Sequence, residues 1–262
     1  MTGQIMGAHE RAILLDESDG LYQWFGEFQL GKPQGFEKLI AKANTKYRSK
    51  HSRLENDGHK TLKKGVDCLV LKAPNLTFGF EALATLDYDV RIIYPIRDPR
   101  AVVASMNKLG HIDILAKQIA SMERHAGIHA EFSDELKIFG NPETPEHIWQ
   151  AHIWRIKSSI FPCFTKVGLK PFVFRYESLI ENKREIVRAM TKHCGLPFDG
   201  KMVRHEFIYQ GEGPGKINRS RSVDDASVDK WKTQLSRQQQ LEIMEIAGDL
   251  ARDFAYNFEY QN

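Results

Sequence analysis

The chain has 262 residues, of which 42% are hydrophobic and 27% charged, so it can bury a large core and is not intrinsically disordered. Its net charge of +3 is compatible with anionic ligands but too small to indicate a nucleic-acid-binding protein. The three cysteines are widely scattered, which argues against a disulfide framework or a zinc site, so we expect no metal. Because no apolar stretch approaches the roughly 20 residues of a membrane helix, and no signal peptide is evident, we expect a cytoplasmic protein.

The first elements in chain order are a short helix and a brief strand. Residues 1–8 have the pattern of the end of a helix, and residues 12–15 form an apolar run typical of a buried strand. The strand ends at three polar residues, 16–18. We interpret the basic and polar run over residues 42–64 as solvated helix surface and loop, with a substrate-binding patch as the alternative.

Further apolar runs predict a parallel sheet. Residues 66–71 and 89–96 are strand candidates, and residues 75–86 between them suit a helix. Strand, helix and strand at this spacing are typical of a βαβ unit, whose two strands run parallel. Residues 171–176 form a third candidate strand, which follows a helical stretch over residues 147–161.

The remainder of the chain is predicted to be helical. Residues 181–194 form an amphipathic helix, and residues 108–145, which break the alternation of strands and helices, are expected to form a lid or insertion. Ser236 and Gln239 have the spacing of a capping box at the start of the last helix. The apolar residues of that helix recur on one face: Leu241, Met244, Ala247, Ala251 and Phe254.

The most informative segment joins a predicted strand to a predicted helix. It reads Ile-Arg-Asp-Pro-Arg-Ala-Val-Val-Ala-Ser over residues 96–105, in which Asp98 can cap the helix and Pro99 suits its first turn. Arg97 therefore lies at the carboxyl end of a strand and beside a helix N-terminus, a position that favours anions. Arg97 and the Ser105 hydroxyl together suit a phosphate monoester. The alternative is that Arg97 pairs with a carboxylate while Ser105 only packs.

Five regions in order along the chain resemble the sulfotransferases that use 3′-phosphoadenosine 5′-phosphosulfate (PAPS). One is the segment just described, which resembles their 3′-phosphate-binding segment. The others are Leu-Lys-Ala-Pro at 71–74, Phe-Arg-Tyr-Glu-Ser-Leu at 174–179, Cys-Gly-Leu-Pro at 194–197, and Lys-Ile-Asn-Arg-Ser at 216–220 with Asp-Lys-Trp-Lys at 229–232. The last region is most similar to the cofactor loop of tyrosylprotein sulfotransferases.

The resemblance implies one domain over residues 1–262, with the three-layer α/β fold of the P-loop nucleotide-binding type and a central parallel sheet. It implies PAPS as co-substrate and a hydroxyl or amine acceptor whose identity cannot be read. It also implies that Arg97 and Ser105 bind the 3′-phosphate, and that Tyr176 and Lys230 line the nucleotide site. The alternatives are a P-loop kinase for a small metabolite and a non-catalytic relative that binds 3′-phosphoadenosine 5′-phosphate (PAP).

Three residues are implied to take part in sulfuryl transfer. Lys72 would stabilise the bridging oxygen of PAPS, and Ser220 would steady the sulfonate or phosphate oxygens. Glu17 would be the base that accepts the proton of the acceptor. Asp16 is its rival, since successive residues of a strand face opposite ways and only one of the two can point into the cleft.

The sequence departs from the family at one point. The 5′-phosphosulfate loop, of the form Pro-Arg-Ser-Gly-Thr-Thr after a buried strand, is absent, and the glycine-rich residues 211–216 do not replace it, because Ile-Asn follows where a P-loop has Ser or Thr. Residues 4–9 resemble the helix that follows this loop in the family. We therefore expect a truncated gene model, with the missing strand and loop encoded in frame upstream. A genuine loss of the loop is the alternative.

Overall fold

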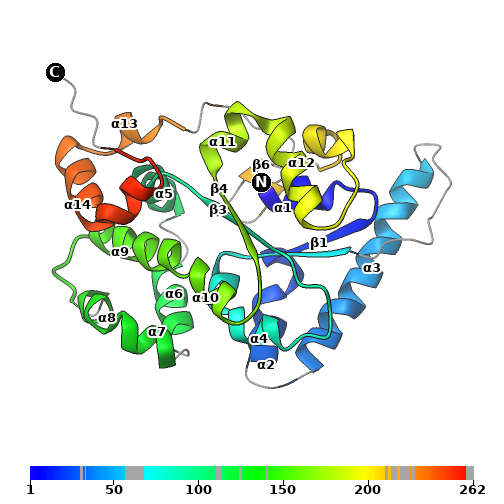
Figure 1. The fold of residues 1–262 in the computed structure, drawn as a ribbon, viewed down its shortest axis with the longest axis horizontal. Helices are drawn as coiled ribbons and strands as arrows, with labels where there is room; N and C mark the ends of the chain where they lie inside the picture. The colour runs from blue at the N-terminus through cyan, green and yellow to red at the C-terminus, as the bar shows by residue number, and fades with distance from the viewer. Residues whose placement is uncertain are drawn as a thin grey trace. The chain divides into compact units, whose positions relative to one another are not determined.

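The computed structural model of the chain, drawn in Figure 1, describes residues 1–29, 32, 34–56, 68–109, 114–123, 126–139, 141–209, 212–213, 217–218, 225 and 228–257. The chain forms two compact units. The first unit contains Met1–Ala82 and Asn182–Val223, and the second contains Leu83–Glu181 and Asp224–Asn262. In the described part of the chain, no helix has both the length and the apolar character needed to cross a membrane.

The first unit is built on one pair of parallel strands. β1 (Ala12–Asp16) and β2 (Cys68–Lys72) pair along their whole length, with Asp16 opposite Lys72. All five residues of β1 are buried, as expected of a strand in a parallel sheet. The other elements are α1 (Thr2–Gly7), η1 (Glu17–Asp19), α2 (Leu21–Gln29), α3 (Gln34–Asn56), η2 (Pro74–Phe78), α4 (Phe80–Ala84) at the boundary, α12 (Lys183–His193), η4 (Gly200–Phe207), and the antiparallel pair β5 (Glu212–Gly213) and β6 (Ile217–Asn218).

Helix α1 lies directly on the strand pair because two of its residues have no side chain. A Cβ atom at Gly3 would lie 2.7 Å from Cγ of Lys72, and one at Gly7 would lie 2.6 Å from Cβ of Leu14. Both distances are too short for carbon atoms that are not bonded.

The buried His9, just after α1, forms a hydrogen bond at each ring nitrogen. Its Nδ1 accepts from the Arg11 N–H at 3.0 Å, so its Nε2 carries the proton. That Nε2 donates to the Pro197 carbonyl, beyond α12, at 3.0 Å.

The second unit contains another parallel pair. β3 (Ile92–Ile96) and β4 (Pro171–Arg175) run side by side in Figure 1, with Ile96 opposite Arg175. The other elements are α5 (Pro99–Met106), η3 (Asn107–Leu109), α6 (Ile114–Glu123), α7 (Ala126–Glu131), α8 (Ser133–Phe139), α9 (Glu146–Ser159), α10 (Phe161–Lys166), α11 (Tyr176–Glu181), α13 (Trp231–Gln234) and α14 (Arg237–Asp253). A buried cluster joins α5, α9, α13 and α14: Ala101, Val103, Ala104, Ala151, Trp231, Leu235 and Ile243.

The strand predictions are confirmed, but one prediction of connectivity is wrong. Among the described residues, β2 and β3 belong to different two-stranded sheets, whereas the predicted βαβ unit places both strands in one parallel sheet. β2 pairs instead with the earlier strand β1, and β3 with the later strand β4. Both pairs are parallel, so each still needs a long crossover connection, which the intervening helices provide.

Several predicted boundaries also differ from the structure. The helix predicted over residues 75–86 divides at Gly79 into η2 and α4. β3 begins at Ile92 and not at residue 89, and Arg91 and Asp89 form an exposed ion pair ahead of the strand. The predicted lid region, residues 108–145, contains η3 and the helices α6 to α8 in its described part. These helices pack towards α9, where the Trp149 indole donates to the Ile138 carbonyl at 3.1 Å.

The last helix forms at the predicted place, is kinked at Gly248, and ends in a turn that reverses the chain. Both hydrogen bonds of the capping box between Ser236 and Gln239 are present at its start. At its end, the N–H of Tyr256 donates to the Ala251 carbonyl and the N–H of Ala255 to the Arg252 carbonyl, each at 2.8 Å. This pair of bonds is the Schellman motif. Ala255 has a φ of +59°, in the left-handed region that glycine usually occupies at this position.

Candidate functional site

The first unit brings two of the predicted catalytic residues into contact. β1 ends at Asp16, and the chain then turns into η1, which begins with Glu17. Lys72 is the last residue of β2, and its Nζ donates to Oε1 of Glu17 at 2.6 Å. The Glu17 side chain is 13% exposed and that of Lys72 is 34% exposed. The two strand ends therefore present a half-buried ion pair.

Glu17 and Asp16 differ in their surroundings. The main-chain N–H of Asp16 donates to Oδ2 of Asp19 at 2.9 Å, and both of these residues are buried. The second oxygen of Glu17, Oε2, is also buried and has no hydrogen-bond partner among the described residues. A buried carboxylate oxygen in this position is costly unless a donor reaches it. Glu17 therefore has a buried carboxylate oxygen that a further donor could satisfy.

In the second unit the structure brings Arg97 and Tyr176 together. Arg97 is half-buried in the turn between β3 and α5, and its guanidinium lies 5.0 Å from the centre of the Tyr176 ring. Tyr176 is the first residue of α11, directly after β4. Because β3 and β4 are parallel neighbours, their carboxyl ends lie at the same edge. A cation over an aromatic ring at this edge can take part in binding a nucleotide phosphate and base.

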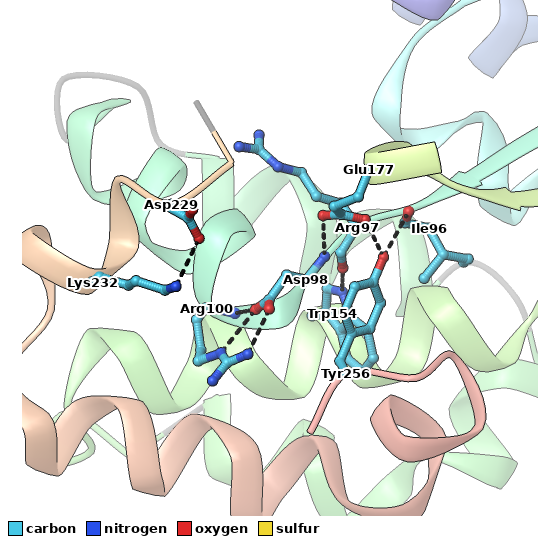
Figure 2. Close-up of polar contacts among 9 residues, drawn as sticks. All are labelled: Ile96, Arg97, Asp98, Arg100, Trp154, Glu177, Asp229, Lys232 and Tyr256. Atoms are coloured by element: carbon cyan, nitrogen blue, oxygen red, sulfur yellow. Dashed lines mark hydrogen bonds and ion pairs between the residues drawn. The ribbon is translucent and has the colours of Figure 1, made fainter. Parts of the chain in front are cut away.

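The helix that follows Arg97 is capped as the sequence predicts. Oδ1 of Asp98 accepts from the N–H of Arg100 at 2.8 Å, and its carboxylate also forms a two-point ion pair with the Arg100 guanidinium, at 3.0 and 2.7 Å (Figure 2). That guanidinium lies 3.8 Å from the centre of the Trp231 ring. Arg100 is buried, so its charge is taken up by the cap and the indole. It thus joins the start of α5 to the start of α13.

Lys230 and Ser105, two further residues predicted for the nucleotide site, are both exposed in the second unit. Lys230 is exposed immediately before α13, in the same unit as Arg97, and its neighbour Trp231 is buried. Ser105 is exposed near the end of α5, about 9 Å along the helix axis from Pro99 at 1.5 Å per residue. Ser220 lies outside the described residues. In the part of the chain that is described, no three His, Cys, Asp or Glu side chains gather in a way that could hold a metal ion.

Sequence reasoning missed the residues that hold the Arg97 turn in place. The Trp154 indole donates to the Arg97 carbonyl at 2.7 Å, and Glu177 accepts from the Asp98 N–H at 3.2 Å. The Tyr256 hydroxyl donates to Oε2 of Glu177 at 2.5 Å. Glu177 lies inside a segment that resembles the sulfotransferases, but nothing in the sequence indicated its role. For Tyr256 the sequence offered no signal beyond its place after the last helix.

Solved structures provide a comparison for the whole chain. The chain is similar to a sulfotransferase domain from the curacin biosynthetic pathway, with a TM-score of 0.52 and 13% identity, over 98% of this chain and 94% of that one. The chain has a sulfotransferase fold. A sulfotransferase domain from the Synechococcus PCC 7002 olefin synthase also aligns, with a TM-score of 0.47 and 15% identity, over 92% of this chain and 76% of that one. No family model and no curated protein matches the sequence.

The similarity confirms the predicted fold at a coarse level. It agrees with strands that pair in parallel between long helical connections. At 13% identity it establishes the fold and not the activity, and it does not favour the tyrosylprotein branch.

Proposed function

We propose that the protein is a sulfotransferase that moves a sulfuryl group from PAPS to a hydroxyl or amine acceptor. The observation that carries this proposal is the contact of 2.6 Å between Glu17 and Lys72 at the ends of two parallel strands. Sulfuryl transfer needs a base beside the acceptor and a cation beside the leaving oxygen. This contact supplies one group of each kind, in a chain with a sulfotransferase fold.

The reaction is balanced without any further reactant. The acceptor oxygen or nitrogen forms a bond to sulfur while the bond between sulfur and the bridging oxygen of PAPS breaks. The proton of the acceptor passes to the Glu17 carboxylate, and the negative charge that develops on the bridging oxygen is stabilised by the Lys72 ammonium. The products are the sulfated acceptor, PAP and a proton.

The 3′-phosphate and the base of the nucleotide are assigned to residues of the second unit. Arg97, with its guanidinium 5.0 Å from the Tyr176 ring, would bind the 3′-phosphate, and Tyr176 would contact the base. Ser105 and Lys230 are exposed in the same unit and would add a hydroxyl and a second cation. Ser220 would steady the transferring group. Residues 108–145 would form a lid or insertion beside the sheet.

The nucleotide assignment is tested by calorimetry with PAP and 5′-AMP. PAP should bind at least about tenfold more tightly, because the 3′-phosphate adds charge-assisted hydrogen bonds. Arg97→Ala should remove this preference. Arg91→Ala is the matched control, since Arg91 is exposed in the same unit and pairs with Asp89 before β3. Equal affinities for PAP and 5′-AMP in the unsubstituted protein would contradict the assignment.

Transfer is tested with sulfur-35-labelled PAPS and a panel of alcohols, phenols and amines. We expect label to move to at least one acceptor class, and the Lys72→Ala variant to lose this activity. Binding of PAP without transfer to any acceptor would point to a non-catalytic nucleotide-binding protein. Transfer of phosphate from ATP, with no preference for PAP, would point to a kinase.

A further inference from the structure

The turn that carries Arg97 is held by side chains at three main-chain groups, which belong to two consecutive peptide groups. The last carbonyl of β3 accepts from the Tyr256 hydroxyl at 3.2 Å, and the next carbonyl, that of Arg97, accepts from the Trp154 indole at 2.7 Å. The next N–H, that of Asp98, donates to Oε1 of Glu177 at 3.2 Å. These groups lie between a strand and a helix, where regular main-chain partners end. Side chains therefore fix the main chain at this point.

Glu177 and Tyr256 form one buried unit within this arrangement. The Tyr256 hydroxyl has one proton, which it shares between the β3 carbonyl and Oε2 of Glu177, the nearer acceptor at 2.5 Å. Glu177 and Tyr256 are only 6% and 3% exposed. A buried carboxylate is costly without donors, and Glu177 has one at each oxygen. Burial and the neighbouring Glu177 raise the pKa of Tyr256, so its hydroxyl keeps its proton and remains a donor. The Arg175 guanidinium lies 4.8 Å from the Tyr256 ring.

The main chain before Tyr256 adopts a strained conformation that directs this ring inwards. Ala255 has a φ of +59°, which costs a residue with a Cβ roughly 1–2 kcal/mol relative to glycine. The Schellman bonds at the end of α14 hold that conformation. Strain of this kind persists where the surrounding structure over-determines it. Here the contacts of Tyr256 with Glu177 and with the end of β3 are such a constraint.

We infer that Glu177 and Tyr256 are positioning residues for Arg97, an inference that rests on the proposed binding of the 3′-phosphate. Glu177 directly follows Tyr176, whose ring lies against the Arg97 guanidinium. One end of α11 thus contacts both the main chain and the side chain of the turn. In Figure 2 the Arg97 side chain extends from the turn in the direction away from the Tyr256 ring. Fixing the main chain lowers the entropy that Arg97 loses when it binds an anion.

The test is the effect of Tyr256→Phe on nucleotide selectivity. This change removes both hydroxyl hydrogen bonds and keeps the ring. We expect PAP affinity to fall about tenfold while 5′-AMP affinity stays nearly constant, since only the 3′-phosphate contacts Arg97. Tyr94→Phe is the matched control, because the buried Tyr94 hydroxyl also donates to a carbonyl, that of Lys157, in the same unit. Its ratio of PAP to 5′-AMP affinity should not change.

A double-mutant cycle separates positioning from general stability. If Tyr256 acts through Arg97, Tyr256→Phe should have no further effect on PAP affinity in an Arg97→Ala background. Glu177→Gln, which keeps the size of the side chain, provides a second variant if Tyr256→Phe does not fold, and it should lower the ratio in the same direction.

The outcomes distinguish this inference from the proposed function. If the unsubstituted protein does not prefer PAP to 5′-AMP, the proposed function fails and the inference fails with it. If it prefers PAP and the preference is unchanged in both Tyr256→Phe and Glu177→Gln, only the inference is overturned. Equal losses of PAP and 5′-AMP affinity in these variants would also overturn it, because they would indicate a general structural role.

Discussion

The ammonium of Lys72 and the carboxylate of Glu17 lie 2.6 Å apart, although 55 residues separate them in the chain. The parallel register places Lys72 opposite Asp16, the residue before Glu17, and the turn into η1 begins at Glu17 itself. The contact therefore depends on the pairing of β1 with β2, which α2 and α3 separate along the chain.

We predict that Glu17→Gln leaves PAP binding nearly intact and lowers turnover by roughly 10²–10⁴, because the amide cannot accept the proton of the acceptor. Calorimetry and the sulfur-35 transfer assay measure the two effects separately. Glu10→Gln, at an exposed position in the same unit, is the control for the loss of a negative charge. Asp16→Asn should lower turnover much less. Unchanged turnover in Glu17→Gln would assign the base to another residue, with Asp16 the first candidate.

We predict that Gly7→Ala destabilises the protein by about 1–3 kcal/mol, because its Cβ would overlap the Cβ of Leu14, which cannot move without its strand. Chemical denaturation measures the change in the free energy of unfolding. Gly127→Ala is the matched control, since a Cβ at this helical position meets nothing within 4 Å. It should leave stability unchanged or raise it by up to about 1 kcal/mol. Equal effects of the two changes would contradict the close packing of α1.

We predict that His205 makes the protein less stable in acid. Burial, helped by the Lys183 ammonium and opposed by Glu206, lowers the pKa of His205 from 6.5 to about 4. The unfolded chain then binds a proton that the folded one does not, so the free energy of unfolding falls as the pH drops from 6.5 towards 4. The contribution is at most about 3 kcal/mol.

The measurement for His205 is the stability of His205→Leu at about pH 7 and about pH 4. The stability lost between these pH values should be smaller in His205→Leu than in the unsubstituted protein, because leucine takes up no proton. His129→Leu, which changes an exposed histidine, should lose as much stability as the unsubstituted protein. Identical losses in all three proteins would show that His205 is not the group responsible.

We predict that Ala255→Gly stabilises the protein by roughly 1 kcal/mol, because glycine adopts a φ of +59° without strain. Thermal unfolding should show a higher midpoint. The entropy that glycine adds to the unfolded chain reduces this gain. Ala151→Gly is a suitable contrast, since Ala151 is buried in the middle of α9 and the same substitution there should be destabilising. A lower midpoint for Ala255→Gly would show that the left-handed conformation carries little strain.

Local sequence patterns determined most of the elements, and the starts of two helices in particular. Asp98 and Pro99 are sufficient to start α5, and Ser236 with Gln239 to start α14, because capping involves residues only two or three apart. The apolar run that became β1 was equally local. The order of resembling segments also indicated the sulfotransferase fold, which the structural similarity supports.

Pairings between distant residues were decided only by the tertiary structure. A run of apolar residues does not specify its neighbour in a sheet, so the pairing of β2 with β1 and not with β3 could not be read from the pattern. The same holds for Tyr256, which reaches Glu177 from 79 residues away through a turn at an alanine that nothing in the sequence marks as left-handed. Burial of the two side chains makes their hydrogen bond necessary, and burial is a property of the packed chain.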